Sequence, residues 1–577
     1  MDLPARSRNG DRLRRRGGPA VVFLVVLAFR IAAYRALEAS PLSAWPLWTE
    51  TDEWGYMDWS ARLAAGNWLD VPAWRSYFSW QEPYGSPEAW ETLYRKNAYF
   101  AGPLYPYTLA LIRMAGLPLV PSVRLLQLLL AGIAAAAIAA AVQAASLRFL
   151  RRGREGDAKR NVEAFSVSPL LAGLVAGLLY GLYGPLVFHD GFAYRDGPVA
   201  HVSALLLALP LLEGARERED RKGSSKGMSK GFFLGLLGGL AALLKQTLLP
   251  LALFSVLLFS KKSPVGAKRR FALGALGLAI PLLALAARNL AAGVPPLTFD
   301  TRQAIGLAWG NARGADGTTA PPEAMKSILE NAGGSTSRTA WFVLKGYADA
   351  PWELPILWAK KALTFFLSYE VPDNSNWYFF RDRLPVLRVL PVFPCLVGAG
   401  LVGLVAALAR GVLRKEEGWL MAVAIATPLA ACLLVQTTSR YRVGVVPPLA
   451  LGFGLFVLLS FEDWRARRRA RVVLRGAAAL FVGGLSAFLP SPIPTPRHRW
   501  ADTIVAATLA EAREGPRAGE QEIRRYLEEG RDDPQREEGK KGTDVWLTGR
   551  RDFTRVAPGG IAPPNRRYGA TADGTGR

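Results

Sequence analysis

Long apolar runs separated by short polar stretches dominate the chain. Most runs are long and continuous enough to be typical of helices that cross a membrane. The pattern predicts about eleven spans, at residues 20–34, 123–147, 169–188, 197–212, 231–244, 247–259, 271–290, 386–409, 418–435, 443–459 and 472–489. The sequence therefore predicts an all-α polytopic membrane protein.

Two long polar and aromatic stretches, residues 38–121 and 291–384, interrupt the predicted spans and are expected to form large external loops. Residues 102–119 are apolar, but the run is short and contains Pro103, Pro106 and Arg113. A full crossing there would place the basic residues 148–160 outside and invert every later loop. We therefore predict a re-entrant or surface-lying helix.

Charge adds an orientation to this pattern. The chain has 577 residues, is 50% hydrophobic and carries a net charge of +24. The cations concentrate beside the apolar runs, in residues 6–16, 148–160, 216–230, 261–270, 410–415 and 465–475. Lys and Arg clusters beside spans mark cytoplasmic loops, so the charge indicates topology and excludes nucleic-acid binding.

This topology divides the chain into three parts. Residues 1–19 are predicted to be a cytoplasmic basic N-terminus, residues 20–490 the membrane domain, and residues 491–577 an external polar tail. Within the tail, residues 501–530 are predicted to form one or two short helices, and the last forty or so residues to be disordered. No small-residue cleavage site follows the first span, which indicates an uncleaved anchor. The Ala, Leu, Arg and Gly excess suggests a bacterial plasma (inner) membrane protein.

Few residues are available for metal or disulfide chemistry. Cys395 and Cys432 both lie in apolar runs and are expected to be packing residues. With only three histidines, a histidine-based metal site is improbable. Acidic residues leave a divalent metal possible, but we predict none.

The pair Asp52-Glu53 stands just beyond the first span, where the chain is predicted to emerge outside. Acids held against a membrane face are costly and are candidates for function. The alternative is that Asp52 only caps a helix over residues 53–67, with its carboxylate accepting the free N–H groups of the first helical turn.

Other polar side chains collect at the predicted external ends of different spans. They include Asp190, Arg195, Asp196, Lys245, Arg288, Arg440 and Arg442. The cations run against the positive-inside trend, and either snorkelling or headgroup anchoring would explain them. An anionic ligand such as a lipid phosphate is the sharper explanation. Acids and cations at one face suit attack on a group activated by a lipid phosphate.

Several motifs resemble the polyprenyl-phosphate-dependent membrane glycosyltransferases of the GT-C fold. These include glycosyltransferase family 39, with the protein O-mannosyltransferases, and the aminoarabinose transferases that modify lipid A. The matching segments are Asp52-Glu53 with Tyr56, residues 101–107, residues 123–127, Arg288-Asn289, Gly310-Asn311, residues 315–318, residues 369–374 and residues 440–443 with Pro447. They cover roughly residues 20–490. One departure is Ala101-Gly102 where the aminoarabinose enzymes have Lys-Pro, and no thirty-four-residue repeat follows the membrane domain.

The resemblance implies roles for these residues. Asp52 would be the base that takes the acceptor proton in an inverting displacement, with Glu53 as a sugar or acceptor ligand. Lys245, Arg288, Arg440 and Arg442 would contact the donor phosphate. Substrate contacts would come from Tyr56, Asp190, Arg195, Asp196 and Glu370. Asp196 could instead cap the span after it, and Asp316-Gly317 is expected to be a turn.

The partners implied are a polyprenyl-phosphate-linked sugar, a lipid, glycan or protein acceptor, and the membrane. A lipid-linked glycan ligase or polymerase is a near alternative, and a transporter or flippase of lipid-linked glycans is a more distant one. A transporter predicts inverted repeats and midplane charges, which the sequence does not show. A membrane scaffold is disfavoured by the clustered polar groups of two large loops. The sequence leaves the sugar, the acceptor and the polyprenol length open.

Overall fold

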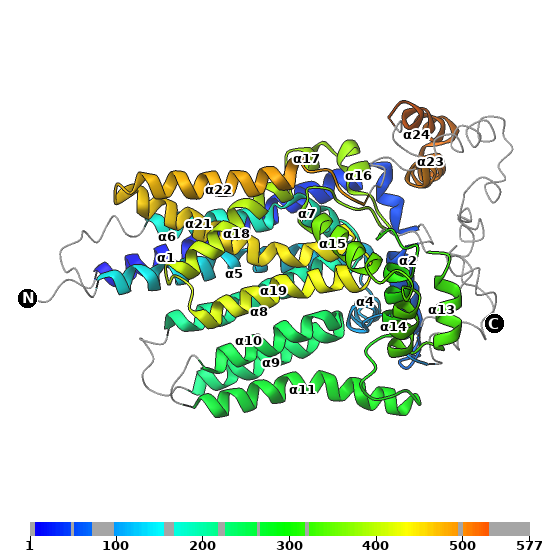
Figure 1. Ribbon diagram of the computed structural model, residues 1–577, viewed down its shortest axis with the longest axis horizontal. Coiled ribbons are helices and arrows are strands. Elements are labelled where there is room, and N and C mark those ends of the chain that lie inside the picture. Colours follow the sequence, from blue (N-terminus) through cyan, green and yellow to red (C-terminus); the bar gives the residue numbers. More distant parts are fainter. Residues whose placement is uncertain are drawn as a thin grey trace, which may run out of the picture.

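The computed structural model describes residues 6–47, 51–71, 97–154, 167–216, 225–261, 266–317, 322–493 and 500–529, and every regular element among them is helical. Most long helices lie side by side along one axis, and several short helices gather beyond one end of this bundle (Figure 1). The bundle helices are α1 (Arg6–Glu38), α5 (Leu119–Arg154), α6 (Val167–Gly181), α7 (Gly184–Asp190), α8 (Asp196–Arg216), α9 (Ser225–Leu244), α10 (Leu249–Lys261), α11 (Ala267–Ala291), α18 (Phe393–Ala409), α19 (Lys415–Leu434), α21 (Val446–Arg465) and α22 (Arg469–Phe488).

The predicted multi-span helical architecture is confirmed. Within the described residues, eight helices are long and apolar enough to cross a membrane, or nine if α6 and α7 form one bent span. The apolar parts of the α9–α10 hairpin, Ser229–Leu244 and Gln246–Lys261, are shorter. These helices occupy the positions of the predicted spans, while the count of eleven stays a prediction.

The span expected at residues 169–188 is not continuous. Helix α6 ends at Gly181, α7 begins at Gly184, and the two axes differ by 51°. Two features explain the break: Pro185 starts the new helix, and the Gly184 N–H donates to the Pro391 carbonyl at 2.9 Å. The bend directs Asp190, the last residue of α7, into the bundle.

The two predicted external loops contribute the short helices. They are η1 (Pro41–Leu47), α2 (Asp52–Ala64), α4 (Leu104–Met114), α12 (Arg302–Asn311), α13 (Met325–Ala332), α14 (Thr336–Lys345), α15 (Glu353–Phe366) and α16 (Trp377–Arg383). The short helix α17 (Pro385–Arg388) follows the second loop and leads into α18, within the candidate span Pro385–Ala409. Helix α4 has 11 residues and packs on α2, so the stretch 102–119 forms a short helix as expected. At about 1.5 Å per residue it is far shorter than a span.

Three short elements connect the spans near the polar end: η4 (Gln246–Leu248), α20 (Ser439–Arg442) and η5 (Val443–Val445). The tail forms two helices, α23 (Trp500–Glu514) and α24 (Pro516–Glu529), which confirms the helices predicted at residues 501–530. The disorder predicted for the last forty or so residues concerns a segment that lies outside the described residues.

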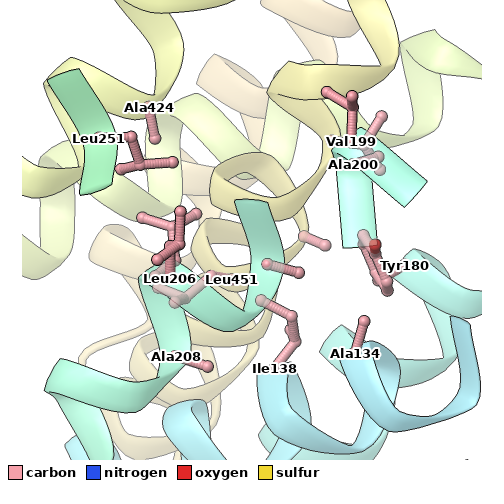
Figure 2. Packing of buried hydrophobic residues seen from close by; sticks show 14 of the residues in the cluster. Ala134, Ile138, Tyr180, Val199, Ala200, Leu206, Ala208, Leu251, Ala424 and Leu451 are labelled. Atoms are coloured by element: carbon pink, nitrogen blue, oxygen red, sulfur yellow. The ribbon is translucent and has the colours of Figure 1, made fainter. Parts of the chain in front are cut away.

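The bundle core is built from small and branched side chains. Ala134 and Ile138 of α5 lie near Leu206 of α8 and Leu451 of α21, with Tyr180 at one edge (Figure 2). Small residues let helix backbones approach closely where lipid supplies little hydrophobic driving force between helices. At the α9–α11 contact, a Cβ on Gly277 would lie 2.1 Å from the Phe232 carbonyl oxygen. Close packing thus fixes how the spans present their ends.

Candidate active site

Helix α2 brings Asp52 to the polar end of the bundle without using it as a cap. The Thr51 side chain accepts the Trp54 N–H at 3.2 Å, so Thr51 is the N-cap and Asp52 is the first helical residue. The Asp52 carboxylate instead pairs with Arg440 at 2.8 Å and with Arg302 at 3.6 Å. The capping interpretation of Asp52 is therefore wrong, because the residue before it performs that task.

Arg440 is the centre of a carboxylate cluster. Its guanidinium lies 2.8 Å from Asp52, 2.8 Å from Asp373 and 3.7 Å from Asp196. These acids come from the first external loop, the second external loop and the start of α8, while Arg440 belongs to α20. The Arg440 side chain is only 5% exposed, so it cannot pass for a solvated headgroup anchor. We call Asp52, Asp196, Asp373, Arg302, Arg440 and Lys245 the charge cluster.

Lys245 joins the cluster through Asp196. It lies between α9 and α10, with its Nζ 3.5 Å from Asp196 Oδ1 and 4.2 Å from the centre of the Tyr441 ring. The residue is 9% exposed, which argues against snorkelling to the surface. Lys245 and Tyr441 also line a cavity whose other walls are mainly apolar side chains of α8, α10 and α19, among them Leu251 and Pro428.

The pKa values of Asp52 and Glu53 are shifted in opposite directions, that of Asp52 by neighbouring charge and that of Glu53 by burial. Burial favours protonation of Asp52, but the charges of Arg302 and Arg440 outweigh it and hold its pKa well below the usual range. Burial raises the pKa of Glu53 to about 7, against the charge of Arg124 and the hydrogen bond from the Ala193 amide. Asp52 is thus an anion, while Glu53 titrates near neutral pH.

Glu53 faces away from the charge cluster. It is fully buried and accepts the Ala193 N–H at 2.6 Å, which ties α2 to the turn between α7 and α8. Tyr56, one turn further along α2, is also buried and packs edge-on against Tyr105 with ring centres 5.3 Å apart. Of the predicted pair, only Asp52 keeps a partly exposed carboxylate, at 14%.

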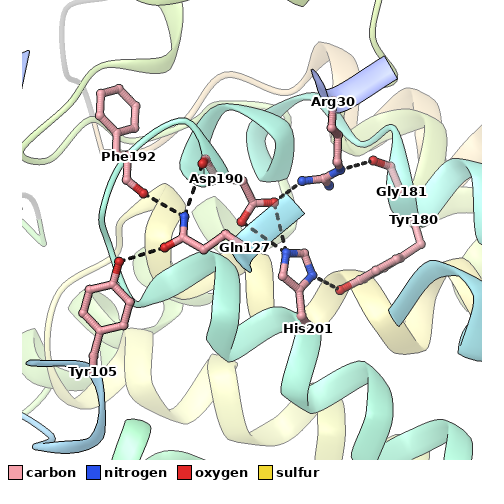
Figure 3. Close-up of polar contacts among 8 residues, drawn as sticks. All are labelled: Arg30, Tyr105, Gln127, Tyr180, Gly181, Asp190, Phe192 and His201. Carbon is pink, nitrogen blue, oxygen red and sulfur yellow. Dashed lines mark hydrogen bonds and ion pairs between the residues drawn. The ribbon is translucent and has the colours of Figure 1, made fainter. Parts of the chain in front are cut away.

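Asp190 belongs to a separate buried network (Figure 3). Its carboxylate pairs with Arg30 of α1 and lies 3.0 Å from His201 Nε2, while His201 Nδ1 lies 2.7 Å from the Tyr180 hydroxyl. A Cβ on Gly197 would lie 1.9 Å from Asp190 Oδ1, so only glycine fits beside this carboxylate. Arg30 and His201 together satisfy both carboxylate oxygens, and we assign Asp190 to the positioning of the turn.

Gln127 of α5 supports the same turn. Its amide donates to the carbonyls of Asp190, at 3.2 Å, and Phe192, at 2.8 Å, and its oxygen accepts the Tyr105 hydroxyl at 2.7 Å (Figure 3). Residues 191–195 are therefore held from several sides before Asp196 enters the charge cluster. Arg195 lies at the edge of the cluster, is buried, and donates to the Leu244 carbonyl at 3.4 Å.

Two predicted phosphate contacts lie elsewhere. Arg442 forms a buried ion pair with Glu370, whose Oε1 also accepts the Tyr183 hydroxyl at 3.0 Å. Arg288 donates to the carbonyls of Asn97, at 2.7 Å, and Leu69, at 2.5 Å. The structure thus joins Asp52, Asp196, Lys245 and Arg440, but places Arg288, Arg442 and Glu370 outside the cluster.

Sequence reasoning missed Arg302 and Asp373 as members of the cluster. Asp373 lies in the matched segment 369–374, and the Asn374 amide, oriented to satisfy its neighbours, accepts the Asp52 N–H at 3.0 Å and donates to Asp373 at 3.3 Å. That segment was the available signal. Arg302 follows no recognisable pattern. Among the described residues, no group of three or more His, Cys, Asp or Glu side chains is arranged to hold a metal ion.

Comparison with models of protein families and with curated proteins finds no match. Among solved structures, the chain is similar to the oligosaccharyltransferase AglB of Archaeoglobus fulgidus. The similarity holds for the enzyme tethered with an acceptor peptide (TM-score 0.37, 15% identity), for its apo form (0.36, 14%) and for its complex with an inhibitory peptide and a dolichol-phosphate (0.34, 15%). Each comparison covers 94% of this chain, which spans 60% of that protein.

Proposed function

We propose that the protein is a membrane glycosyltransferase that moves a sugar from a polyprenyl-phosphate donor to an acceptor hydroxyl on the external face. The observation that carries the proposal is the charge cluster. One partly exposed carboxylate, Asp52, pairs with two cations from separate segments, Arg302 and Arg440. Asp196 links Arg440 to a third cation, Lys245, at the same end of the spans. This is the chemistry that an acceptor hydroxyl and a departing lipid phosphate require.

The reaction is a single displacement. The acceptor oxygen bonds to the anomeric carbon, the bond from that carbon to the phosphate oxygen breaks, and polyprenyl phosphate leaves with the bonding electrons. The acceptor proton passes to the Asp52 carboxylate. Since one carboxylate acts as base and no covalent sugar is formed, the configuration inverts.

The cations also control the basicity of Asp52. In the free protein, Arg302 and Arg440 hold its pKa below the usual range, which makes it a weak base. A donor phosphate beside the same cations would neutralise part of their charge and raise the pKa of Asp52. Donor binding would thus activate the base, and acceptors would be attacked only when the donor is in place.

The donor contacts we propose are Lys245, Arg440 and Arg302. Arg302 replaces Arg288 and Arg442, which are engaged by loop carbonyls and by Glu370. The apolar cavity beside Lys245 suits the first isoprene units of a lipid whose phosphate meets the lysine. Tyr56 and Arg195 border the cluster, and Asp190 and Glu53 hold the turn that brings Asp196 into it. No metal is required by this arrangement.

The test compares cells with and without the protein. Envelope lipids, glycans and proteins are examined for a mass difference of one sugar, and the lipid fraction for an accumulated polyprenyl-phosphate sugar. Loss of a single-sugar modification together with donor accumulation supports the proposal. Accumulation of a diphosphate-linked oligosaccharide would show a ligase or polymerase instead. A donor trapped on the cytoplasmic leaflet, with transfer intact in permeabilised cells, would show a flippase.

A further inference from the structure

A buried lysine in the second external loop binds the end of a membrane span directly before the Arg440 segment. The Lys361 side chain of α15 is fully buried. Its Nζ lies 2.6 Å from the Gly310 carbonyl, 3.1 Å from Leu433, 2.9 Å from Val435 and 3.1 Å from Asn311 Oδ1. A buried ammonium with four oxygen acceptors holds the segments that carry those oxygens together.

Two of the oxygens that Lys361 binds, those of Leu433 and Val435, are carbonyls at the C-terminal end of α19. The last carbonyls of a helix lack partners within it, and the negative end of its dipole attracts a cation. Asn311 completes the set, because its Nδ2 donates to the Leu434 carbonyl at 2.8 Å. Three consecutive carbonyls, those of residues 433, 434 and 435, are thus bound by two side chains of the second external loop.

The contact between Lys361 and the end of α19 requires a glycine at position 310. A Cβ on Gly310 would lie 1.2 Å from the Val435 carbonyl oxygen, so any larger residue would push the loop from the helix end. The Gly310-Asn311 motif therefore has a structural meaning: glycine permits the approach, and asparagine caps the helix.

The segment that leaves α19 is paired to the same loop. The Thr437 N–H donates to the Gly317 carbonyl at 3.1 Å, and the Ser439 N–H donates to the Val371 carbonyl at 3.0 Å. Gly317 has a φ of +87°, which places a glycine turn beneath this contact. Arg440 follows directly, so the backbone that leads into it is held by two hydrogen bonds to the second external loop.

We propose that Lys361, with Gly310 and Asn311, is a positioning device that docks the second external loop onto α19 and thereby sets the place of Arg440 in the charge cluster. Its functional part rests on the proposed function, since Arg440 is there a phosphate contact. The same loop supplies Asp373, so one docking contact fixes both partners of the Arg440–Asp373 pair.

The test uses the full-length protein in nanodiscs and the variants Lys361→Met, Lys361→Arg and Asn311→Ala. Lys360→Met is the matched control, because Lys360 is the adjacent, exposed lysine of the same helix. Amide hydrogen exchange at residues 437 and 439 is followed well below the unfolding temperature, and binding of undecaprenyl phosphate is measured per folded protein.

We expect exchange at both amides to rise about tenfold or more in Lys361→Met, with a smaller rise in Asn311→Ala. Undecaprenyl phosphate affinity should fall about tenfold in Lys361→Met, recover in part in Lys361→Arg, and stay unchanged in Lys360→Met. Unchanged protection of residues 437 and 439 in both Lys361→Met and Asn311→Ala would overturn the proposal. So would lost protection with wild-type affinity, because Arg440 would then not depend on the docking. If the wild type binds no undecaprenyl phosphate while protection is lost as expected, the docking stands and the proposed function fails.

Discussion

At one end of the bundle a single aspartate forms ion pairs with several arginines, and at the other end a single arginine forms ion pairs with several aspartates. Asp463, at the end of α21, lies 3.1 Å from Arg410 and 3.8 Å from Arg468, and also pairs with Arg475. Arg440, at the opposite end of the spans, is surrounded by Asp52, Asp196 and Asp373.

The two centres differ in where their partners come from. Arg475 of α22 and Arg410, the residue that follows α18, are 12 and 53 residues from Asp463. Asp52 is 388 residues from Arg440. A surplus of cations at helix ends orients a membrane protein and staples adjacent spans. Carboxylates gathered around one buried arginine from distant segments carry desolvation costs that structure alone does not require, which points to a ligand site.

The first prediction tests whether the two ends face opposite sides of the membrane. A Cys introduced at Arg152 or Lys268 should resist an impermeant thiol reagent in whole cells and react fully after permeabilisation, because we expect the basic ends of the spans to be cytoplasmic. A Cys at Lys360, in the second external loop, should react in intact cells. All three positions are exposed in the structure. Labelling at position 152 in whole cells would reverse the predicted topology, and the two ends of the bundle would then not face the sides we expect.

The second prediction compares Asp52, the proposed base, with Asp463 at the basic end of the bundle. Asp52→Asn should lower sugar transfer at least about a hundredfold, because the amide cannot accept the acceptor proton, while insertion and donor-lipid binding remain. Asp463→Asn is the matched change at the other end and should lower the melting temperature with transfer within about threefold of wild type. Transfer is measured with the donor that accumulates in cells lacking the protein.

Two outcomes would reassign the base. Near-normal transfer in Asp52→Asn with a large loss in Glu53→Gln would make Glu53 the base. If both variants keep their activity, the acidic pair is structural, and the chemistry must lie in the turn from Asp190 to Asp196.

The third prediction concerns the phosphate. Lys245→Ala should weaken donor binding about tenfold, because a buried cation beside the cavity is lost, and Lys245→Arg should retain part of the affinity. Lys230, a cation paired with Glu213 near the basic end, provides the control, and its replacement by Ala should leave affinity unchanged. Wild-type affinity in Lys245→Ala would mean that the lysine serves only to neutralise Asp196.

The smallest effect is expected at Glu53, and it depends on pH. The folded-state pKa of Glu53 is about 7 and its ordinary value is 4.5, so the wild type loses stability as the pH rises between these values. Gln accepts the same Ala193 N–H without a charge. The melting temperature of Glu53→Gln relative to wild type should therefore increase from pH 5 to pH 7 and then level off, with transfer reduced less than about tenfold. A difference that is constant across this range would contradict the assignment.

Local patterns predicted the helices better than the site. Hydropathy over a span is a property of consecutive residues, so the membrane helices could be located from the sequence. The bend before α7 was missed because Gly181 to Pro185 break the helix without interrupting the apolar run. Lys245 stood out as a lone cation between two short apolar helices, and the structure places it in the cluster.

The site residues that sequence reasoning missed or misplaced share one cause. The sequence places a charged residue at the end of a span but does not show whether its partner is a ligand, another side chain or a loop carbonyl. Arg442 is met by Glu370 and Arg288 by two carbonyls of the first loop, whereas Arg302 meets Asp52. These pairings depend on how the two external loops fold back on the bundle, which no spacing within either loop specifies.

The short α9–α10 hairpin has a consequence for the bilayer around the protein. Helix α10 has 13 residues, which span about 20 Å at 1.5 Å per residue. The hydrocarbon core is about 30 Å thick, so lipids beside this hairpin must compress or tilt to match it. Where α10 serves as a span, Lys245 at the tip of the hairpin would lie deeper than the surrounding headgroups. A lipid phosphate, the ligand proposed for Lys245, could then reach the lysine without leaving the bilayer.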